Sequence, residues 1–403
     1  MSEERGASSE QHVEPGALGE GASVPRGVVE ATPEQPGARA AIAAALRSGP
    51  SHAYSFVGPA GSGKAASARA LVAELLALGA GDPDDSRRRA LADPSPHPDL
   101  VWLRPPGNQH LVEDVRRGVI AAVSYRPFEG SKRAFVIEAA EAMAEESQNA
   151  LLKTLEEPPS YVHLILITSE PSGLLETVRS RCQQVTFAAL PPEVLERRLA
   201  AELPGASPEL VAALAGLGGG DLDRARLLGT PTGERLRAIA EGCSRAAVSG
   251  RPGERPWTAL LALAGERGKQ ESSAVVEAAG ERAAELGKGR DADRVRREGT
   301  DAAKRADRRA RTDAIDLALR LVASWFTDLV AVAEGAPELA RNADRSEELE
   351  ADASHADPVA SRQVAELAMV TRGRLRVNVN EELALDALFH RAARMLGDRG
   401  RVL

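Results

Sequence analysis

A glycine-rich segment near the N-terminus, GPAGSGK at residues 58–64, has the spacing of a phosphate-binding loop, G-x-x-x-x-G-K. In such a loop the backbone N–H groups of a tight turn bind phosphate oxygens, and the lysine reaches the β- and γ-phosphates. A chance match is the alternative, because the chain contains 36 glycines. The segment nevertheless follows an apolar run and precedes a helical pattern, which is the context that this motif requires. The predicted nucleotide-contacting residues of the loop are Gly58, Gly61, Ser62, Gly63 and Lys64.

Two positions that a hydrolytic site of this class needs are occupied by alanine. Ala65 follows the lysine, where a serine or threonine hydroxyl would bind Mg²⁺. Glu138 ends the apolar run AFVI, where a metal-binding carboxylate is expected, and Ala139 replaces the glutamate that would activate water. Glu138 and Glu141 can equally be solvated charges at the end of a strand. The pattern predicts a site in which ATP binding with Mg²⁺ can survive while hydrolysis is weak or absent.

Two arginines and a cysteine are further candidates for a functional role. Arg181, in ETVRSRCQQ, can be an arginine finger donated to a neighbour's γ-phosphate or an ordinary surface arginine. Arg224, in GGGDLDRAR, can reach back to nucleotide phosphate or lie solvated on a helix. Cys182 is interpreted as a small buried side chain, because no histidine that could activate it lies near it in sequence.

The composition is that of an ordinary globular protein with room for two or three domains. The 403 residues are 43% hydrophobic and 27% charged, and the net charge of −8 argues against nucleic-acid binding through bulk charge. The cysteines, Cys182 and Cys243, have no histidine close in sequence, so no structural zinc or other metal site is expected. With no long apolar run and no signal-peptide pattern, the chain is expected to be cytoplasmic and without membrane contact.

Strand and helix patterns alternate in the first half of the chain, which predicts an α/β fold with a parallel sheet covered on both faces. Residues 1–25, rich in Gly, Ser and Glu, are expected to be a disordered tail. Residues 79–98 are a polar insertion that contains several prolines. Strands are predicted at 52–58, 99–105, 133–140, 162–170 and 184–190, and helices at 35–49, 64–79, 112–124 and 145–157.

From Pro191 onward the sequence contains no convincing strand pattern. Residues 191–240 predict a small helical unit, and the remainder is helical with a highly charged part at about 266–312. Basic residues cluster at 304–311, but the acidic residues among them favour a solvated helix face over a DNA-binding surface. A buried helical stripe is predicted at Ile315, Leu319, Val322 and Phe326.

Taken together, these segments resemble the AAA+ family of bacterial clamp-loader subunits, and within it the delta-prime group of DNA polymerase III. The resemblance covers about residues 30–403, and the combination of NALLKTLEEPP with RSRC is far more specific than the phosphate-binding loop alone. The segments that carry it are SHAYSFVGPAGSGK (51–64), HPDL (97–100), ESQNALLKTLEEPP (146–159), LILITSEPSGLLETVRSRCQ (164–183), GGGDLDRA (218–225) and NVNEELALDAL (378–388).

The resemblance implies three domains: an AAA+ sheet domain with a phosphate-binding loop (26–190), a helical lid (191–245) and an all-helical collar (246–403). It implies a stator subunit that helps ATP-driven loading of a sliding clamp on primed DNA during replication. The implied partners are motor subunits of the gamma/tau type, the delta subunit, the sliding clamp and, through the complex, primed DNA. Because no polymerase carboxylate constellation is visible, any polymerase activity would be that of the holoenzyme.

The resemblance also implies roles for single residues. Arg181, in the Ser-Arg-Cys motif, would complete the ATP site of the adjacent motor subunit. Thr168 would be the first sensor, and Arg224 would be the sensor arginine of the lid. The family's zinc module has four cysteines before HPDL, whereas residues 79–98 contain none, so zinc is not expected.

Two other functions are open from the sequence. An ATP-hydrolysing motor subunit of the same loader is the main alternative, but it would keep a serine or threonine at position 65 and an Asp-Glu pair at 138–139. A free-standing phosphotransferase would need a substrate-binding domain, and the helical second half offers an assembly surface instead. The charged part at 266–312 matches the family poorly and receives no function from it.

Overall fold

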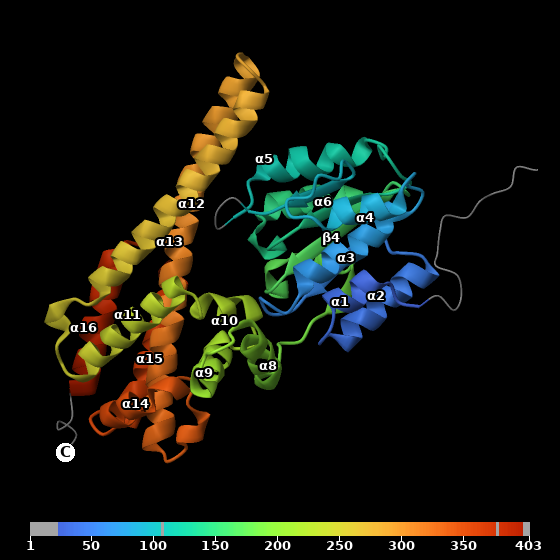
Figure 1. The fold of residues 1–403 in the computed structure, drawn as a ribbon. Helices are drawn as coiled ribbons and strands as arrows, with labels where there is room; N and C mark the ends of the chain where they lie inside the picture. The colour runs from blue at the N-terminus through green and yellow to red at the C-terminus, as the bar shows by residue number, and fades with distance from the viewer. Residues whose placement is uncertain (1–22, 106–108, 376–378, 398–403) are drawn as a thin grey trace, which may run out of the picture.

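The structure is a computed structural model that describes residues 23–105, 109–375 and 379–397. Most of the tail expected at 1–25, together with Asn378 of the C-terminal motif, lies outside these ranges. A sheet domain is followed by a wholly helical part, which confirms the predicted order of the two halves (Figure 1). Among the described residues, no helix combines the length and the apolar character that crossing a bilayer requires.

Five parallel strands form one sheet in the order β2-β3-β4-β1-β5. The strands are β1 (Ala53–Val57), β2 (Leu100–Leu103), β3 (Arg133–Ile137), β4 (Val162–Thr168) and β5 (Gln183–Thr186). Each overlaps a predicted strand, but β5 is shorter than expected because the chain turns toward the helical part soon after Phe187. Since the strands are parallel, the segments that follow β1, β3 and β4 meet at one edge of the sheet.

The sheet separates two hydrophobic cores. Alternate residues of a strand point to opposite faces, and Ile165 and Ile167 of β4 accordingly join one core while Leu164 and Leu166 join the other. The first core is covered by α1 (Arg26–Ala31), α2 (Pro36–Ser48), α3 (Lys64–Ala77) and α4 (Pro83–Leu91). The second is covered by α5 (Val112–Val115), α6 (Glu145–Glu156) and α7 (Glu176–Arg179).

Two elements differ from the sequence predictions. The polar insertion contains α4, which begins with Pro83 and is capped by Asp82, whose carboxylate accepts hydrogen bonds from two backbone N–H groups. The single helix predicted at 112–124 is wrong in detail, because α5 continues as a π-helical turn, η1 (Arg116–Ile120), and a 3-10 turn, η2 (Ala122–Ser124). The π-helical turn contains Gly118, and glycine weakens a regular helix.

One continuous hydrophobic core unites the helices of the second half. The predicted stripe at Ile315, Leu319, Val322 and Phe326 is buried in it, which confirms that prediction. The expected boundary between lid and collar, at residue 245, falls within α11 and stays a prediction. The helices are α8 (Pro192–Glu202), α9 (Pro208–Gly218), α10 (Leu222–Leu228), α11 (Pro231–Val248), α12 (Trp257–Glu285), α13 (Arg290–Ala333), α14 (Ser346–Ala353), α15 (Pro358–Leu375) and α16 (Glu381–Gly397).

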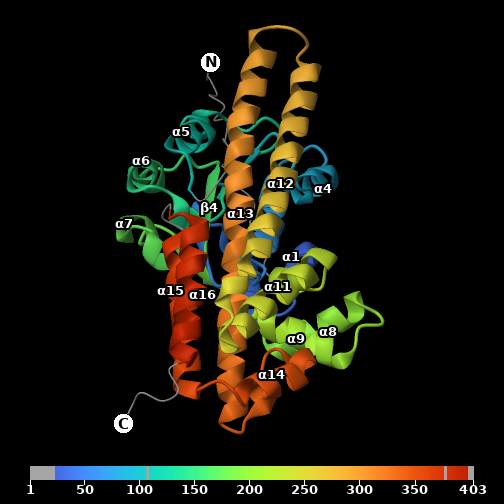
Figure 2. The same cartoon turned by 90° about the vertical axis from the view of Figure 1, so that its left-hand side faces the viewer.

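The charged part at 266–312 lies in a long hairpin of α12 and α13, which we call the arm. Figures 1 and 2 show the arm extending from the helical body alongside the sheet domain. With 44 residues, α13 is about 66 Å long at 1.5 Å per residue. Small residues such as Ala279, Ala283 and Ala303 are buried between the two helices, whereas most of the charged side chains are exposed.

Candidate nucleotide-binding cleft

The predicted phosphate-binding loop joins β1 to α3 at the edge where the strands end. Gly61 and Gly63 both have left-handed backbones, with φ of +67° and +91°, and Gly63 caps α3. The loop lines a cleft of about 650 Å³, whose walls also include Glu138, Ser169 and residues of the helical part. A helix N-terminus with glycine N–H groups is a favourable binding site for an anion such as phosphate.

Lys64 is turned back onto its own loop. Its ammonium donates hydrogen bonds to the carbonyls of Gly58 and Pro59 and lies 3.4 Å from the Ser169 hydroxyl. Burial lowers the pKa of Lys64 to about 8, although the nearby carboxylates of Glu141 and Asp221 oppose the shift. In this conformation the lysine stabilises the loop, and it must exchange these carbonyls for phosphate oxygens when a nucleotide binds.

Gln35, which was not predicted from the sequence, holds the loop in place. Its side-chain amide donates to the carbonyls of Ser62 and Ala188 and accepts from the N–H of Ala188, at 2.8–3.2 Å. The Ser62 hydroxyl donates to the Pro59 carbonyl at 2.8 Å and is therefore directed into the loop. These bonds join the loop to the segment that leads from β5 into α8.

The acidic end of β3 is tied up in ion pairs. The Glu138 carboxylate accepts a hydrogen bond of 2.7 Å from Arg104, which also pairs with Asp93. Arg104 is the main cause of the lowered pKa of Asp93. Glu138 lines the cleft. The sequence suggested that it is a solvated charge or a weak metal ligand, and its pairing with an arginine was not predicted. Within the described ranges, no group of three His, Cys, Asp or Glu side chains could hold a metal ion.

The two alanines that replace the expected metal-binding and water-activating residues lie in the wall of the cleft. Ala65, in the first turn of α3, and Ala139, directly after Glu138, both line the cleft. Ala139 has a left-handed backbone with φ of 48°, which is uncommon for a residue with a side chain. Its neighbour Glu141 accepts from the Ser169 N–H at 3.2 Å, while its other carboxylate oxygen is buried without a hydrogen-bond partner.

Neither of the two predicted sensor residues lines the cleft. Thr168 ends β4, and its hydroxyl accepts a hydrogen bond from the Glu170 N–H. The next residue, Ser169, has its hydroxyl near Lys64 and lines the cleft. Arg224 lies in α10 and pairs with Asp221 at 3.2 Å. The residues of the helical part that do line the cleft include Arg198, Asp223 and Arg226.

Asp221 packs directly on the phosphate-binding loop. A Cβ atom added to Gly61 would lie 2.0 Å from the Asp221 carboxylate and 2.7 Å from its Cα. The same carboxylate caps α10 by accepting the N–H of Arg224 at 3.0 Å. Glycine at position 61 is therefore required twice, by the left-handed backbone and by the close approach of the helical part.

Replacement of Gly61 by alanine is expected to lower the free energy of unfolding by about 1–3 kcal/mol, because it strains the backbone and displaces Asp221. Chemical denaturation followed by circular dichroism measures the change. Gly81→Ala is the matched control, because Gly81 has open space at its Cβ and no positive φ. Equal stability of the two variants would contradict the close contact between the loop and Asp221.

Arg181 lies away from the cleft, just beyond α7. Its guanidinium donates to the Glu156 carboxylate at 2.7 Å and to the Thr177 carbonyl at 2.8 Å, and 36% of the side chain is exposed. It is not among the residues that line the chain's own cleft. Cys182, beside it, is half-buried, and burial raises the pKa of its thiol to about 12, as expected for a packing residue.

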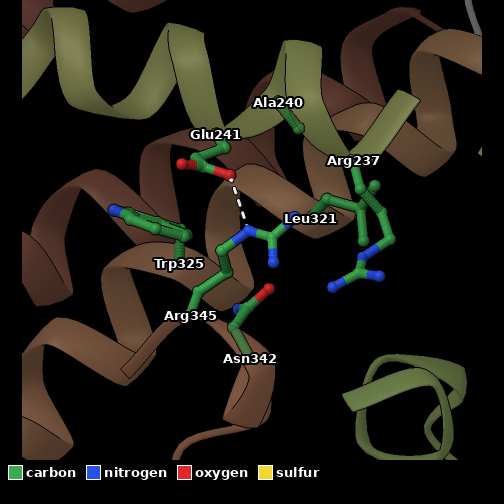
Figure 3. A pocket seen from close by; sticks show the side chains of 7 residues that line it. All are labelled: Arg237, Ala240, Glu241, Leu321, Trp325, Asn342 and Arg345. Carbon is green, nitrogen blue, oxygen red and sulfur yellow. Dashed lines mark hydrogen bonds and ion pairs between the residues drawn. The ribbon is translucent and has the colours of Figure 1, made fainter. Parts of the chain in front are cut away.

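A second hollow lies in the helical part and is too small for a nucleotide. Its volume is about 10 Å³, and Figure 3 shows Arg237, Glu241 and Arg345 around it. Arg345 donates to the Glu241 carboxylate at 3.2 Å, and Arg237 donates twice to Asp344 at 2.6 Å. The side chains therefore form a partly buried ion-pair cluster between α11 and the turn η7 (Ala343–Arg345).

Residues 37–191 match the family model described as "DNA polymerase III, delta subunit". The DNA polymerase III subunit delta' of Pseudomonas aeruginosa is 36% identical over 202 residues, which cover 48% of this chain and 61% of the relative. The subunit delta' of Bacillus subtilis is 36% identical over 155 residues, which cover 37% of this chain and 46% of the relative.

The DNA polymerase III subunit gamma/tau of Mycobacterium bovis is also similar, at 33% identity over 165 residues, which cover 37% of this chain and 26% of the relative. The matched part of this chain thus spans less than two thirds of the length of each of these relatives. The resemblance to delta-prime clamp-loader subunits that the sequence motifs predicted is confirmed by the family model and the two delta' relatives.

Proposed function

Because the chain is similar to delta-prime subunits, we propose that it is a stator subunit of a bacterial clamp loader. In this role it joins motor subunits of the gamma/tau type and a delta subunit, and it helps them load a sliding clamp on primed DNA. The chain itself binds ATP but hydrolyses it weakly or not at all. Arg181 acts in trans on the ATP of the adjacent motor subunit.

The observation that carries this proposal is the pair of alanines in the wall of an otherwise intact phosphate-binding cleft. Ala65 offers no hydroxyl for Mg²⁺, and Ala139 offers no carboxylate to activate water. Glu138, the remaining acidic group at this edge, is bonded to Arg104. The exposed position of Arg181, outside the cleft, agrees with action on another subunit.

A motor subunit is the alternative function, and ATP turnover by the isolated full chain with Mg²⁺ separates the two. We expect hydrolysis at least about a hundredfold slower than that of a motor subunit, because general-base catalysis alone contributes 10²–10⁴-fold. Lys64→Ala is the control, since it removes the loop cation without touching Arg181. Brisk turnover that disappears in Lys64→Ala would replace the stator proposal by the motor function.

Any ATP binding that depends on Lys64 should weaken as the pH rises through about 8. The pKa of Lys64 lies below its usual 10.5, so the free protein loses this proton near pH 8, whereas a bound polyphosphate requires the charged form. The affinity at pH 9 is expected to be about tenfold lower than at pH 7. The Lys64→Ala variant should lack this decrease, and a decrease of equal size in that variant would assign it to another group.

A further inference from the structure

Arg309 connects the arm to the sheet domain. It lies in α13, and its guanidinium donates a hydrogen bond of 2.7 Å to the carbonyl of Pro105, a residue 204 positions earlier in the chain. It is also one of the residues that line the cleft, together with Gly63 and Lys64 of the phosphate-binding loop. Figure 2 shows α13 crossing in front of the sheet domain, so this contact follows from the course of the arm.

The arm holds Arg309 at a defined position because its two helices pack closely. A Cβ atom added to Gly268 of α12 would lie 2.4 Å from the Asp307 carboxylate, and one added to Gly299 of α13 would lie 2.3 Å from the Ala279 Cβ. Arg311, half a turn beyond Arg309, donates to Glu381 of α16 at 2.7 Å. The contacts around position 309 therefore hold α13 against α12, and Arg311 joins α13 to α16.

The charges around Arg309 leave it suited to bind an anion. The carboxylate of its intrahelical partner, Asp313, is 3.7 Å away. The Arg309 side chain is 43% exposed and that of Asp313 is 66% exposed, so this ion pair is weak. Lys64 is likewise bonded to neutral carbonyls, those of its own loop, whereas Arg104 is engaged by two carboxylates. A guanidinium can bind two phosphate oxygens at once, which a neutral carbonyl such as that of Pro105 cannot match.

We propose that Arg309 binds the polyphosphate chain of a nucleotide held in the cleft beside the phosphate-binding loop. The inference rests on the nucleotide-binding part of the proposed function. Arg309 then supplies, from the same chain, a positive charge at a site where Ala65 cannot position Mg²⁺. Exchange of the Pro105 carbonyl for phosphate would couple the occupancy of the cleft to the arm and, through α13, to the helical body.

Isothermal titration of the full chain with ATP, and separately with inorganic tripolyphosphate, tests the proposal. Arg309→Ala is expected to bind both ligands at least about tenfold more weakly than the wild type, as the loss of a charge-assisted hydrogen bond predicts. Arg309→Lys should recover part of the affinity, because it restores the charge without the two-pronged geometry. Arg294→Ala is the matched control: it removes the same charge from α13 at a residue that pairs with Asp291 and does not line the cleft.

Hydrogen exchange of residues 300–315 distinguishes ligand binding from a purely structural contact. ATP should change the exchange of this segment in the wild type and not in Arg309→Ala. Unchanged affinity in Arg309→Ala would overturn the proposal, even if the arm exchanges faster. A wild type that binds neither ATP nor tripolyphosphate would overturn it as well, while the stator function would still be judged separately by the Arg181→Ala variant.

Discussion

Replacement of Arg181 by alanine is expected to slow ATP hydrolysis at one site of the reconstituted clamp loader by about a thousandfold or more. An arginine finger typically contributes 10³–10⁵-fold, because it neutralises charge that develops on the transferred phosphoryl group. In the isolated chain Arg181 pairs with Glu156, and both side chains are at least one third exposed. Such a surface ion pair contributes little, so the arginine can exchange it for a phosphate on a neighbouring subunit.

A single-turnover measurement gives the sharpest readout. In a loader assembled with Arg181→Ala and mixed with clamp and primed DNA, one equivalent of bound ATP per assembly should stay unhydrolysed on the time scale of wild-type turnover. Arg179→Ala, an exposed arginine two residues earlier, should behave like the wild type. Gel filtration must show an intact assembly in all three cases. Complete hydrolysis at wild-type rate by the Arg181→Ala assembly would exclude the finger role.

Replacement of Asp344 by alanine should cause the largest loss of stability, about 3–5 kcal/mol in the free energy of unfolding. Asp344 accepts two hydrogen bonds of 2.6 Å from Arg237, and about 10% or less of each side chain is exposed. Without its carboxylate, the buried guanidinium would have lost its main partner in a poorly hydrated place. Figure 3 shows how Arg237 points into this cluster beside Arg345 and Asn342.

Urea denaturation followed by circular dichroism measures this loss. Arg235→Ala on the same helix is the control, because the Arg235–Glu266 pair is more than half exposed on both sides and should contribute within about 0.5 kcal/mol. The double variant Arg237→Met, Asp344→Leu should recover much of the stability, since it leaves no unpaired charge. A single variant Asp344→Ala as stable as Arg235→Ala would show that the cluster does not hold α11 against η7.

Local residue patterns were enough to predict the sheet domain and the glycine-rich turn between its first strand and the following helix. Patterns such as VHLILIT and GPAGSGK are local, because a buried strand and a turn that needs φ above zero each require particular residue types within a few positions. For the same reason, the alanines at positions 65 and 139 were predicted to face the cleft before any contact was known. The helical character of the charged part was also expected, although its hairpin was not.

Which side chains meet at the cleft depends instead on how elements far apart in the sequence pack together. Gln35 is hydrogen-bonded to Ala188, 153 residues later in the chain, and Arg309 is hydrogen-bonded to Pro105, 204 residues earlier. Asp221 packs on Gly61. The hydrophobic periodicity of a sequence does not predict such pairs, because the partner of a polar side chain depends on how whole helices pack and not on the adjacent residues in the sequence. The close packing of α12 on α13, at small residues such as Gly268 and Gly299, holds Arg309 at the cleft, and the charge pattern of this segment did not predict that position.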